Sequence, residues 1–255
     1  MKLRILGSGT STGVPVIGCQ CKVCRSADPR DHRYRASALV KTDEGKNILI
    51  DCGPDCREQM LKYPTFEQIH AVLLTHEHYD HVGGLDDLRP YGVFGDIPIF
   101  AQHDVAEALR VRMPYALVTN TYPGRPRIYL QEIEAGKNFL LGKTEIKTVR
   151  VMHGNLPILG YVLGGKLAYI TDMLTMPEYS FSALQGVEVL VINALRPEKH
   201  AAHQSVRQAV ETAKRIGARM TYFIHMSHSI GLHEEACCNL PDGMTFAYDG
   251  MEVVL

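Results

Sequence analysis

Short apolar runs and segments with helical spacing follow one another along the whole chain. Apolar runs bounded by turn residues predict strands at residues 3–6, 37–42, 47–51, 71–74, 97–101, 139–152 (split at Gly142), 159–163, 166–170, 187–192 and 220–224. Helical patterns lie at residues 57–63, 83–89, 105–111 and 205–216, and the last carries apolar residues on one face. Strands mixed with helices in this way indicate an α/β fold.

One segment breaks the pattern. Residues 113–127 contain three prolines, two tyrosines and two arginines without a regular period. An irregular stretch of this length is where a loop that covers a substrate is expected.

Several predicted strands end directly at a histidine or an aspartate. One such ending is unremarkable, but here there are five: Asp51, His76, His153, Asp172 and His225. Imidazole nitrogens and carboxylate oxygens together suit zinc, manganese or iron. We therefore expect one rim of a sheet layer to gather these side chains around metal.

Composition and charge narrow the class of protein. With 255 residues, 45% of them hydrophobic and 22% charged, the chain fits one soluble domain over residues 1–255. A formal charge of −1 provides no basic field for nucleic acid. No apolar run approaches the ~20 residues of a membrane span, and residues 1–7 lack a signal-peptide pattern. Seven cysteines, an odd number, favour metal chemistry in a reducing compartment. We expect a cytoplasmic protein without a membrane partner, and a homodimer stays open.

The most specific chemistry lies just after the predicted strand 71–74. His76 and His78 are two residues apart and can converge on one ion where the chain leaves the strand. Asp80 and His81 follow at a distance that suits a second, neighbouring ion. A helical H-E-x-x-H site would need histidines four residues apart. The alternative is a histidine-rich surface loop, which the position after a buried strand disfavours.

A second cluster contains three cysteines within six residues. Cys19, Cys21 and Cys24 offer three thiolates, one ligand short of a closed tetrahedral zinc site. If His225 faces the histidine centre, His228 is free to complete this set, which predicts a structural zinc. The alternative is three free cysteines in a loop.

The order H-x-H-x-D-H at residues 76–81 resembles the signature of the metallo-β-lactamase superfamily. The resemblance implies an αββα sandwich and two divalent ions, zinc or manganese. The first ion would be held by His76, His78 and His153, the second by Asp80, His81 and His225, with Asp172 bridging the two. Asp51 would support the ligand loop from behind, although a turn-capping role explains it equally well.

The cysteine cluster and His203 together resemble the phosphoribosyl cyclic phosphate phosphodiesterases of this superfamily. Asp80 and His203 are the residues to which we assign catalytic roles, and His203 as an imidazolium would assist the leaving oxygen. Arg89 is the first candidate for binding a phosphate, and Tyr91, Arg112 and Tyr115 are weaker ones. The expected reaction is attack by metal-activated water on a small cyclic phosphodiester, so a small phosphorylated substrate is the expected partner.

Other functions remain open on the same residues. A tRNA 3′-processing nuclease of this fold is disfavoured by the near-neutral charge and by the cysteine cluster. A thioester or lactam hydrolase would leave His203 without a clear task. A metal-bearing carrier without turnover, resembling the pyrroloquinoline quinone pathway protein, shares the cysteine pattern.

Overall fold

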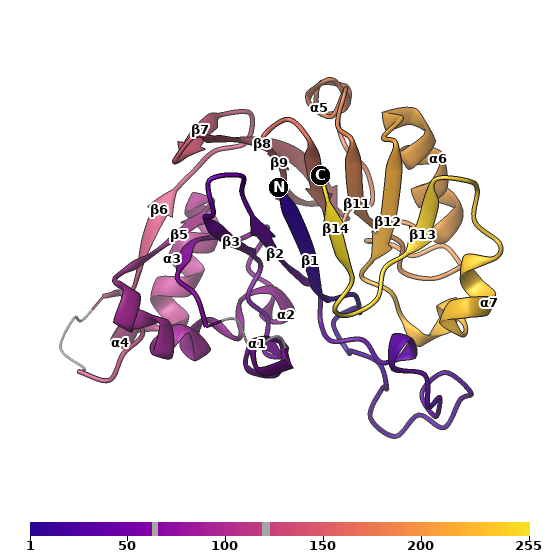
Figure 1. Ribbon diagram of the computed structural model, residues 1–255, viewed down its shortest axis with the longest axis horizontal. Helices are drawn as coiled ribbons and strands as arrows, with labels where there is room; N and C mark the ends of the chain where they lie inside the picture. The colour runs from indigo at the N-terminus through magenta and orange to yellow at the C-terminus, as the bar shows by residue number, and fades with distance from the viewer. Residues whose placement is uncertain (63–65, 119–122) are drawn as a thin grey trace.

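Two β-sheets lie face to face, with helices on both outer faces (Figure 1). The computed structural model describes residues 1–62, 66–118 and 123–255. One seven-stranded sheet has the order β14–β1–β2–β3–β4–β5–β6, with bounds β1 Lys2–Gly7, β2 Ser37–Lys41, β3 Asn47–Ile50, β4 Ile69–Leu73, β5 Ile97–Ala101, β6 Ile128–Glu132 and β14 Glu252–Val254. The other has the order β13–β12–β11–β10–β9–β8–β7, with bounds β7 Asn138–Leu141, β8 Thr144–His153, β9 Leu156–Leu163, β10 Leu167–Ile170, β11 Val189–Asn193, β12 Met220–Ile224 and β13 Met244–Phe246.

The helices divide between the two outer faces. The first sheet is covered by α1 Cys56–Lys62, α2 Tyr79–Val82, the 3-10 helix η2 Leu85–Phe94, α3 His103–Arg112 and α4 Pro114–Leu117. The second is covered by α5 Glu178–Ala183, α6 Val206–Ile216 and α7 His233–Cys237. Two further 3-10 turns lie at η1 Pro29–Asp31 and η3 His228–Ile230. This layering is the αββα sandwich expected from the sequence.

The central core lies between the sheets. Alternate residues of each strand point inward, so Leu3 and Ile5 of β1 share one buried cluster with Leu159 and Tyr161 of β9. β11 is buried along its whole length and pairs in parallel with β10 and β12, as its continuous apolar run predicts.

Parallel pairing brings the functional strand ends together. β3 pairs in parallel with β4, and β10, β11 and β12 are parallel to one another. The carboxyl ends of parallel strands meet at one edge of their sheet, so residues that follow these strands share that edge. The two chain termini lie side by side at the opposite end, where β1 pairs with β14 (Figure 1).

Most predicted elements are confirmed, and the differences have physical reasons. The segment predicted as a helix at 83–89 forms the 3-10 helix η2, which contains Pro90. The short elements β6, β13, β14, α5 and α7 had no prediction because three to six residues carry too little periodicity. Residues 119–122 of the predicted covering loop lie outside the described residues.

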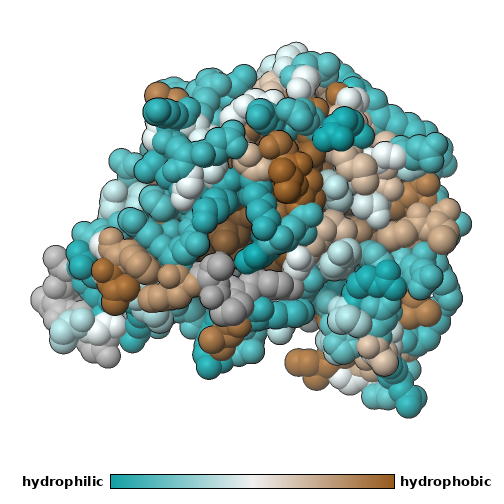
Figure 2. Space-filling model, in the orientation of Figure 1, coloured by the Kyte–Doolittle hydropathy of each residue, from teal (hydrophilic) through white to brown (hydrophobic). Residues whose placement is uncertain are grey.

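No described helix has the length and apolar character that crossing a membrane requires. The face seen in Figure 2 is mainly hydrophilic, with separate hydrophobic patches.

Candidate metal centre

Three histidines form the first candidate ligand group. His76 and His78 follow β4, and His153 is the last residue of β8. Their ring centroids are 4.6 Å apart for His76–His78, 5.6 Å for His76–His153 and 5.1 Å for His78–His153. One nitrogen from each ring lies within 4.8 Å of the others. The two sheets therefore bring these residues, 75 positions apart, to one point.

The second group contains Asp80, His81, Asp172 and His225. His81 Nε2 lies 3.2 Å from a carboxylate oxygen of Asp80 and 3.2 Å from one of Asp172. His225 Nε2 lies 3.1 Å from the other Asp172 oxygen. Two nitrogen or oxygen ligands of one tetrahedral ion, each ~2.1 Å from it, are about 3.4 Å apart. The spacing thus fits ligands that share a cation, and Asp172 presents both oxygens to this group.

Buried nitrogens without hydrogen bonds support this fit. Within the described residues, His76 Nε2, His81 Nε2 and His225 Nε2 are buried and form no hydrogen bond. Buried polar atoms are nearly always paired, so these atoms call for another partner. The donor set of imidazole and carboxylate suits a divalent cation such as zinc or manganese.

Contacts behind the ligands fix the orientation of the rings. His81 Nδ1 lies 2.7 Å from Asp51 Oδ2, and the amide of Thr75 donates to Asp51 Oδ1 at 2.8 Å. His153 Nδ1 lies 3.1 Å from the carbonyl oxygen of Ala202, which places the donated proton on Nδ1. Nε2 of both rings is then free to bind metal. Of the two roles left open for Asp51, these contacts show that it holds the ligand loop.

The carboxylates and imidazoles shift one another's pKa values. Burial raises the pKa of Asp172, but the neighbouring His225 and His81 outweigh it and hold the pKa well below its usual range. Burial lowers the pKa of His81, but the negative charges of Asp172 and Asp51 raise it by more, so the net shift is upward. Burial and the His81 charge both lower the pKa of His76. The Asp172 carboxylate therefore stays ionised beside the imidazoles, as a ligand of a cation must be.

His203 lies at the junction of the two groups. Its ring centroid is 4.5 Å from that of His153 and 4.9 Å from that of His225, and its Nδ1 is 3.7 Å from Asp172. Burial and the neighbouring His225 lower the pKa of His203 to about 3. The expectation of an imidazolium is therefore revised, because the ring is neutral near pH 7 and can contribute an N–H donor instead of a charge.

The cysteine cluster comes together with His228. The Nδ1 atom of His228 lies 3.3 Å from Cys19 Sγ, 3.3 Å from Cys21 Sγ and 3.4 Å from Cys24 Sγ. Sulfur and nitrogen ligands of one tetrahedral zinc are about 3.5 Å apart. The four side chains therefore fit one structural zinc, at a place separate from the histidine centre. Cys52 and Cys56 are buried thiols outside this group.

The arginines are placed differently from the expectation. Arg89 pairs with Asp86 at 2.8 Å and lines a separate cleft of about 480 Å³ with Met60 and Pro90. None of the histidine-centre residues lines that cleft among the described residues. Arg112, the last residue of α3, donates to the Glu77 carbonyl and pairs with the Glu77 carboxylate at 3.0 Å. Arg112 is thus the arginine held beside the ligand loop, and the geometry favours it over Arg89.

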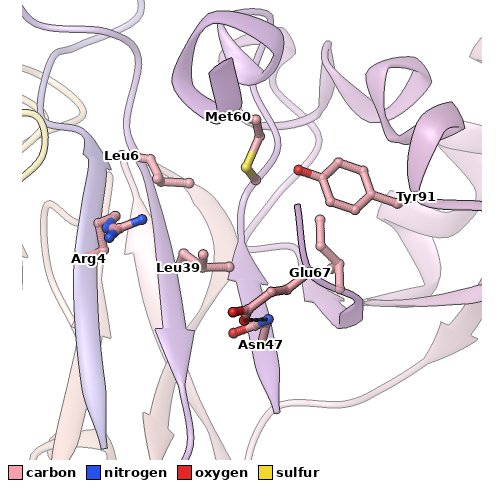
Figure 3. Close-up of a pocket in the computed structure, with 8 residues that line it drawn as sticks. Arg4, Leu6, Leu39, Asn47, Met60, Glu67 and Tyr91 are labelled. Atoms are coloured by element: carbon pink, nitrogen blue, oxygen red, sulfur yellow. Dashed lines mark hydrogen bonds between the residues drawn. The ribbon is translucent and has the colours of Figure 1, made fainter. Parts of the chain in front are cut away.

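A small cavity on the outer face of the first sheet is unrelated to the centre. Arg4, Leu6 and Leu39 line it from the strands, facing Met60 and Tyr91 from the helices (Figure 3). Its volume is about 10 Å³, room for one water at most. It is a packing gap and not a substrate site.

Two contacts that support the ligands were not predicted from the sequence. Thr75, whose hydroxyl is 3.0 Å from His76 Nδ1, could have been noticed because it directly precedes the first ligand. The glycine-rich loop after β1 pairs with the last ligand strand through Met226 N to Ser8 O, at 3.0 Å. No local signal marks that second contact, since it joins residues more than 200 positions apart.

Comparison with known proteins identifies the family. The β-lactamase superfamily domain matches residues 46–226. The octanoyltransferase of Porphyromonas gingivalis is 44% identical over 256 residues, which is all of this chain and 52% of that protein. The coenzyme PQQ synthesis protein B of Methylorubrum populi is 39% identical over 228 residues, 76% of this chain and 72% of that protein.

Solved structures agree with that assignment. A diphosphatase from the PhnP family superposes with a TM-score of 0.91 at 36% identity, covering 100% of this chain and 97% of the other. The zinc-bound PqqB from Methylobacterium extorquens superposes over 100% of both chains, with a TM-score of 0.81 at 22% identity, and shows the shared fold. The chain belongs to the metallo-β-lactamase superfamily, in its PhnP-like subgroup.

Proposed function

We propose that this protein is a metal-dependent phosphodiesterase that hydrolyses a small cyclic phosphodiester of the phosphoribosyl 1,2-cyclic phosphate kind. The observation that carries the proposal is His203, placed between the ligands His153 and His225 at ring distances of 4.5 and 4.9 Å. Activation of water would need only the cations that the ligands hold. An additional buried imidazole beside both ligand groups suits a reaction with a poor alkoxide leaving group.

The chain's own residues divide the work. One divalent cation would be held by His76, His78 and His153. The other would be held by Asp80, His81 and His225, and Asp172 would bridge the two. When bound, such a pair lowers the pKa of a shared water and stabilises charge on phosphoryl oxygens. The Asp80 carboxylate, whose side chain is 13% exposed, is open to the substrate side and can orient the attacking water. The neutral His203 ring donates an N–H hydrogen bond to the departing sugar oxygen and so stabilises the charge that develops there.

The C-terminal end of α3, beside the ligand loop, would bind the phosphate of the substrate that does not react. The Arg112 guanidinium is 46% exposed and already fixed by Glu77, so it can receive a phosphate without losing its position. Charge-assisted hydrogen bonds from a fixed guanidinium select phosphate over neutral groups. The similarity to a PhnP-family diphosphatase supports chemistry at phosphorus.

A substrate screen tests the proposal. The protein is loaded with zinc or manganese and assayed on bis(p-nitrophenyl) phosphate, phosphoribosyl 1,2-cyclic phosphate and a tRNA precursor. We expect turnover of both small diesters and none of the tRNA. Activity on the tRNA alone, falling steeply with salt, would instead indicate a nuclease. Absence of hydrolysis with any metal would favour a carrier.

A second candidate function follows from one relative. The octanoyltransferase of Porphyromonas gingivalis contains a match to this whole chain in about half of its length. A hydrolase that acts on an octanoyl thioester would fit such an arrangement. An octanoyl thioester is therefore included in the screen. Hydrolysis of the thioester, with no hydrolysis of either phosphodiester, would replace the first proposal.

A further inference from the structure

A cysteine and a histidine outside the metal centre form a close pair on α7. His233 and Cys237 are four residues apart, one helical turn, so their side chains meet on one face. Cys237 Sγ lies 3.6 Å from His233 Nε2 and 3.4 Å from the hydroxyl of Thr245 in β13. Cys237 is partly exposed, so a small molecule can reach the sulfur.

Buried nitrogens without hydrogen bonds occur on His233 and on Arg33, whose charge interacts with Cys237. Arg33 is 2% exposed, and within the described residues none of its three guanidinium nitrogens forms a hydrogen bond. The nearest counter-charge is Asp31, 3.6 Å away. His233 is 5% exposed, and its Nδ1 is also without a hydrogen bond. Unused donors on a buried cation are unfavourable unless an anion or water satisfies them.

The charged surroundings favour the thiolate form of Cys237. His233 contacts Cys237 from the same helix, and Arg33, in the segment before β2, interacts with it through its charge. Burial raises the pKa of Cys237, but the hydrogen bonds from His233 and Thr245 lower it to about 7. The neighbouring Cys238 is exposed and lies 3.3 Å from the Glu234 carbonyl oxygen.

We propose that Cys237 is an oxidation site for small hydroperoxides, built from the His233 imidazole and the buried Arg33 guanidinium. The thiolate attacks one peroxide oxygen, so an S–O bond forms as the O–O bond breaks. Sulfur is oxidised by two electrons and the peroxide is reduced to an alcohol or water. The proton given up by the thiol passes through His233 to the departing oxygen. The product is the sulfenic acid, which keeps the proton of the attacked peroxide oxygen; its ionisation to the sulfenate releases that proton to solvent and is favoured by the Arg33 charge.

Trapping of the sulfenate tests the proposal on the zinc-loaded protein. Because the two cysteines are adjacent, each is followed in a variant that lacks the other, Cys238→Ser for Cys237 and Cys237→Ser for Cys238. Hydrogen peroxide is added with dimedone, and the labelled peptide is quantified by mass spectrometry from pH 5.5 to 9. We expect the labelling rate of Cys237 to have its midpoint near pH 7, below the ~8.5 of an ordinary free cysteine.

Replacement of His233 shows whether the reactivity of Cys237 depends on the imidazole or only on the exposure of the sulfur. In the Cys238→Ser background, His233→Gln should move the midpoint to about 8.5. The labelling rate should then fall about threefold at pH 7 and about sixfold at pH 6, since a less acidic thiol is also more nucleophilic. His103→Gln, which alters an exposed imidazole on α3, is the matched control and should change nothing.

Two results would overturn the proposal. One is a midpoint for Cys237 in the wild-type environment that equals that of Cys238, or no adduct at Cys237 at any pH. The other is an unchanged midpoint in His233→Gln when circular dichroism and zinc content show an intact protein. The midpoint for Cys237 is measured with both Cys237 and His233 in place. It therefore remains a valid test even if His233→Gln fails to fold.

Discussion

Three residues of the metal centre have a left-handed backbone. Asp51, Asp172 and His225 have φ angles of 56°, 54° and 56°, and they are the described non-glycine residues with positive φ. Each lies within two residues of a strand end, where the turn directs its side chain across the sheet edge. This conformation costs about 1–3 kcal/mol per residue and persists where surrounding contacts enforce it. Strain at three strand ends is therefore part of how the centre is assembled.

Asp51 allows a clean test of support from behind the ligands. In Asp51→Asn the left-handed backbone remains acceptable, because asparagine adopts it readily. The charge opposite His81 Nδ1 is lost, so ring orientation and ligand basicity suffer. We expect metal affinity or kcat/KM to fall about 10–100-fold, measured by metal titration and steady-state kinetics. Asp96→Asn, at an exposed pair with Arg127, should leave both unchanged.

His203 should act on the chemical step more than on binding. With the proposed phosphodiesterase, His203→Ala removes the N–H donor at the leaving oxygen, and kcat should fall about 10²–10³-fold with a small change in KM. A substrate with a good leaving group, such as p-nitrophenolate, should lose much less. His200→Ala is the matched control, since its ring lies 5.0 Å from that of His203 and belongs to none of the candidate ligand groups among the described residues. Equal losses on both substrates would exclude the assigned role.

At the scale of elements, two helices present arginines to different surroundings. Arg112 ends α3 beside the ligand loop, whereas Arg89 lies in η2 and pairs with Asp86. If Arg112 receives a substrate phosphate, Arg112→Met should raise KM about tenfold or more, because charged hydrogen bonds contribute about 1.5–3 kcal/mol. Arg89→Met should leave KM within error. The reverse result would restore Arg89 as the phosphate ligand.

The cysteine loop is docked as a unit on α7 and η3. Lys22 pairs with Glu235 at 2.9 Å, and Asp31 accepts from the His233 amide at 2.7 Å. A zinc held by this loop and His228 would tie the N-terminal segment to the last ligand strand.

Cys21→Ser tests this element. We expect the loss of about one zinc per chain and a Tm lower by roughly 4–8 °C, as for a loss of about 2 kcal/mol in a chain of this size. The metals of the histidine centre should be partly retained. Elemental analysis and calorimetry provide the measurements, with the exposed Cys238→Ser as control. Unchanged zinc content would rule out a separate structural site.

At the scale of the molecule, Asp249 joins distant segments. Its carboxylate accepts from the amide and hydroxyl of Ser8, each at 2.8 Å, and from the Tyr34 amide at 2.7 Å. Burial raises the pKa of Asp249 to about 6, although these hydrogen bonds oppose the shift.

This raised pKa predicts a pH-dependent stability. Between pH 4 and 6 the unfolded chain has lost the Asp249 proton while the folded chain keeps it, so stability falls as pH rises. The contribution is complete below about pH 4 and lost above about pH 6, with a size of about 3 kcal/mol. We expect the free energy of unfolding of wild type relative to Asp249→Asn to decrease over this window, as urea titrations at each pH can measure. A constant difference would show that the carboxyl titrates normally.

Local sequence pattern by itself determined the strands and the residues that end them. An apolar run of four or five residues has few ways to be buried, so β3, β4, β10 and β12 could be located with their terminal Asp51, His76, Asp172 and His225. The close spacing of Cys19, Cys21 and Cys24 likewise marks their chemistry without knowledge of the fold.

Only the tertiary structure decided what these residues meet. The pairing of β1 with β14, the position of Arg112 beside Glu77, and the contact of Asp31 with His233 join segments from 35 to about 250 residues apart. Such contacts depend on how two twisted sheets and their helices pack, and periodicity along the chain carries no information about that. The neutral state of His203 has the same origin, because burial and neighbouring imidazoles, not residue type, set its pKa.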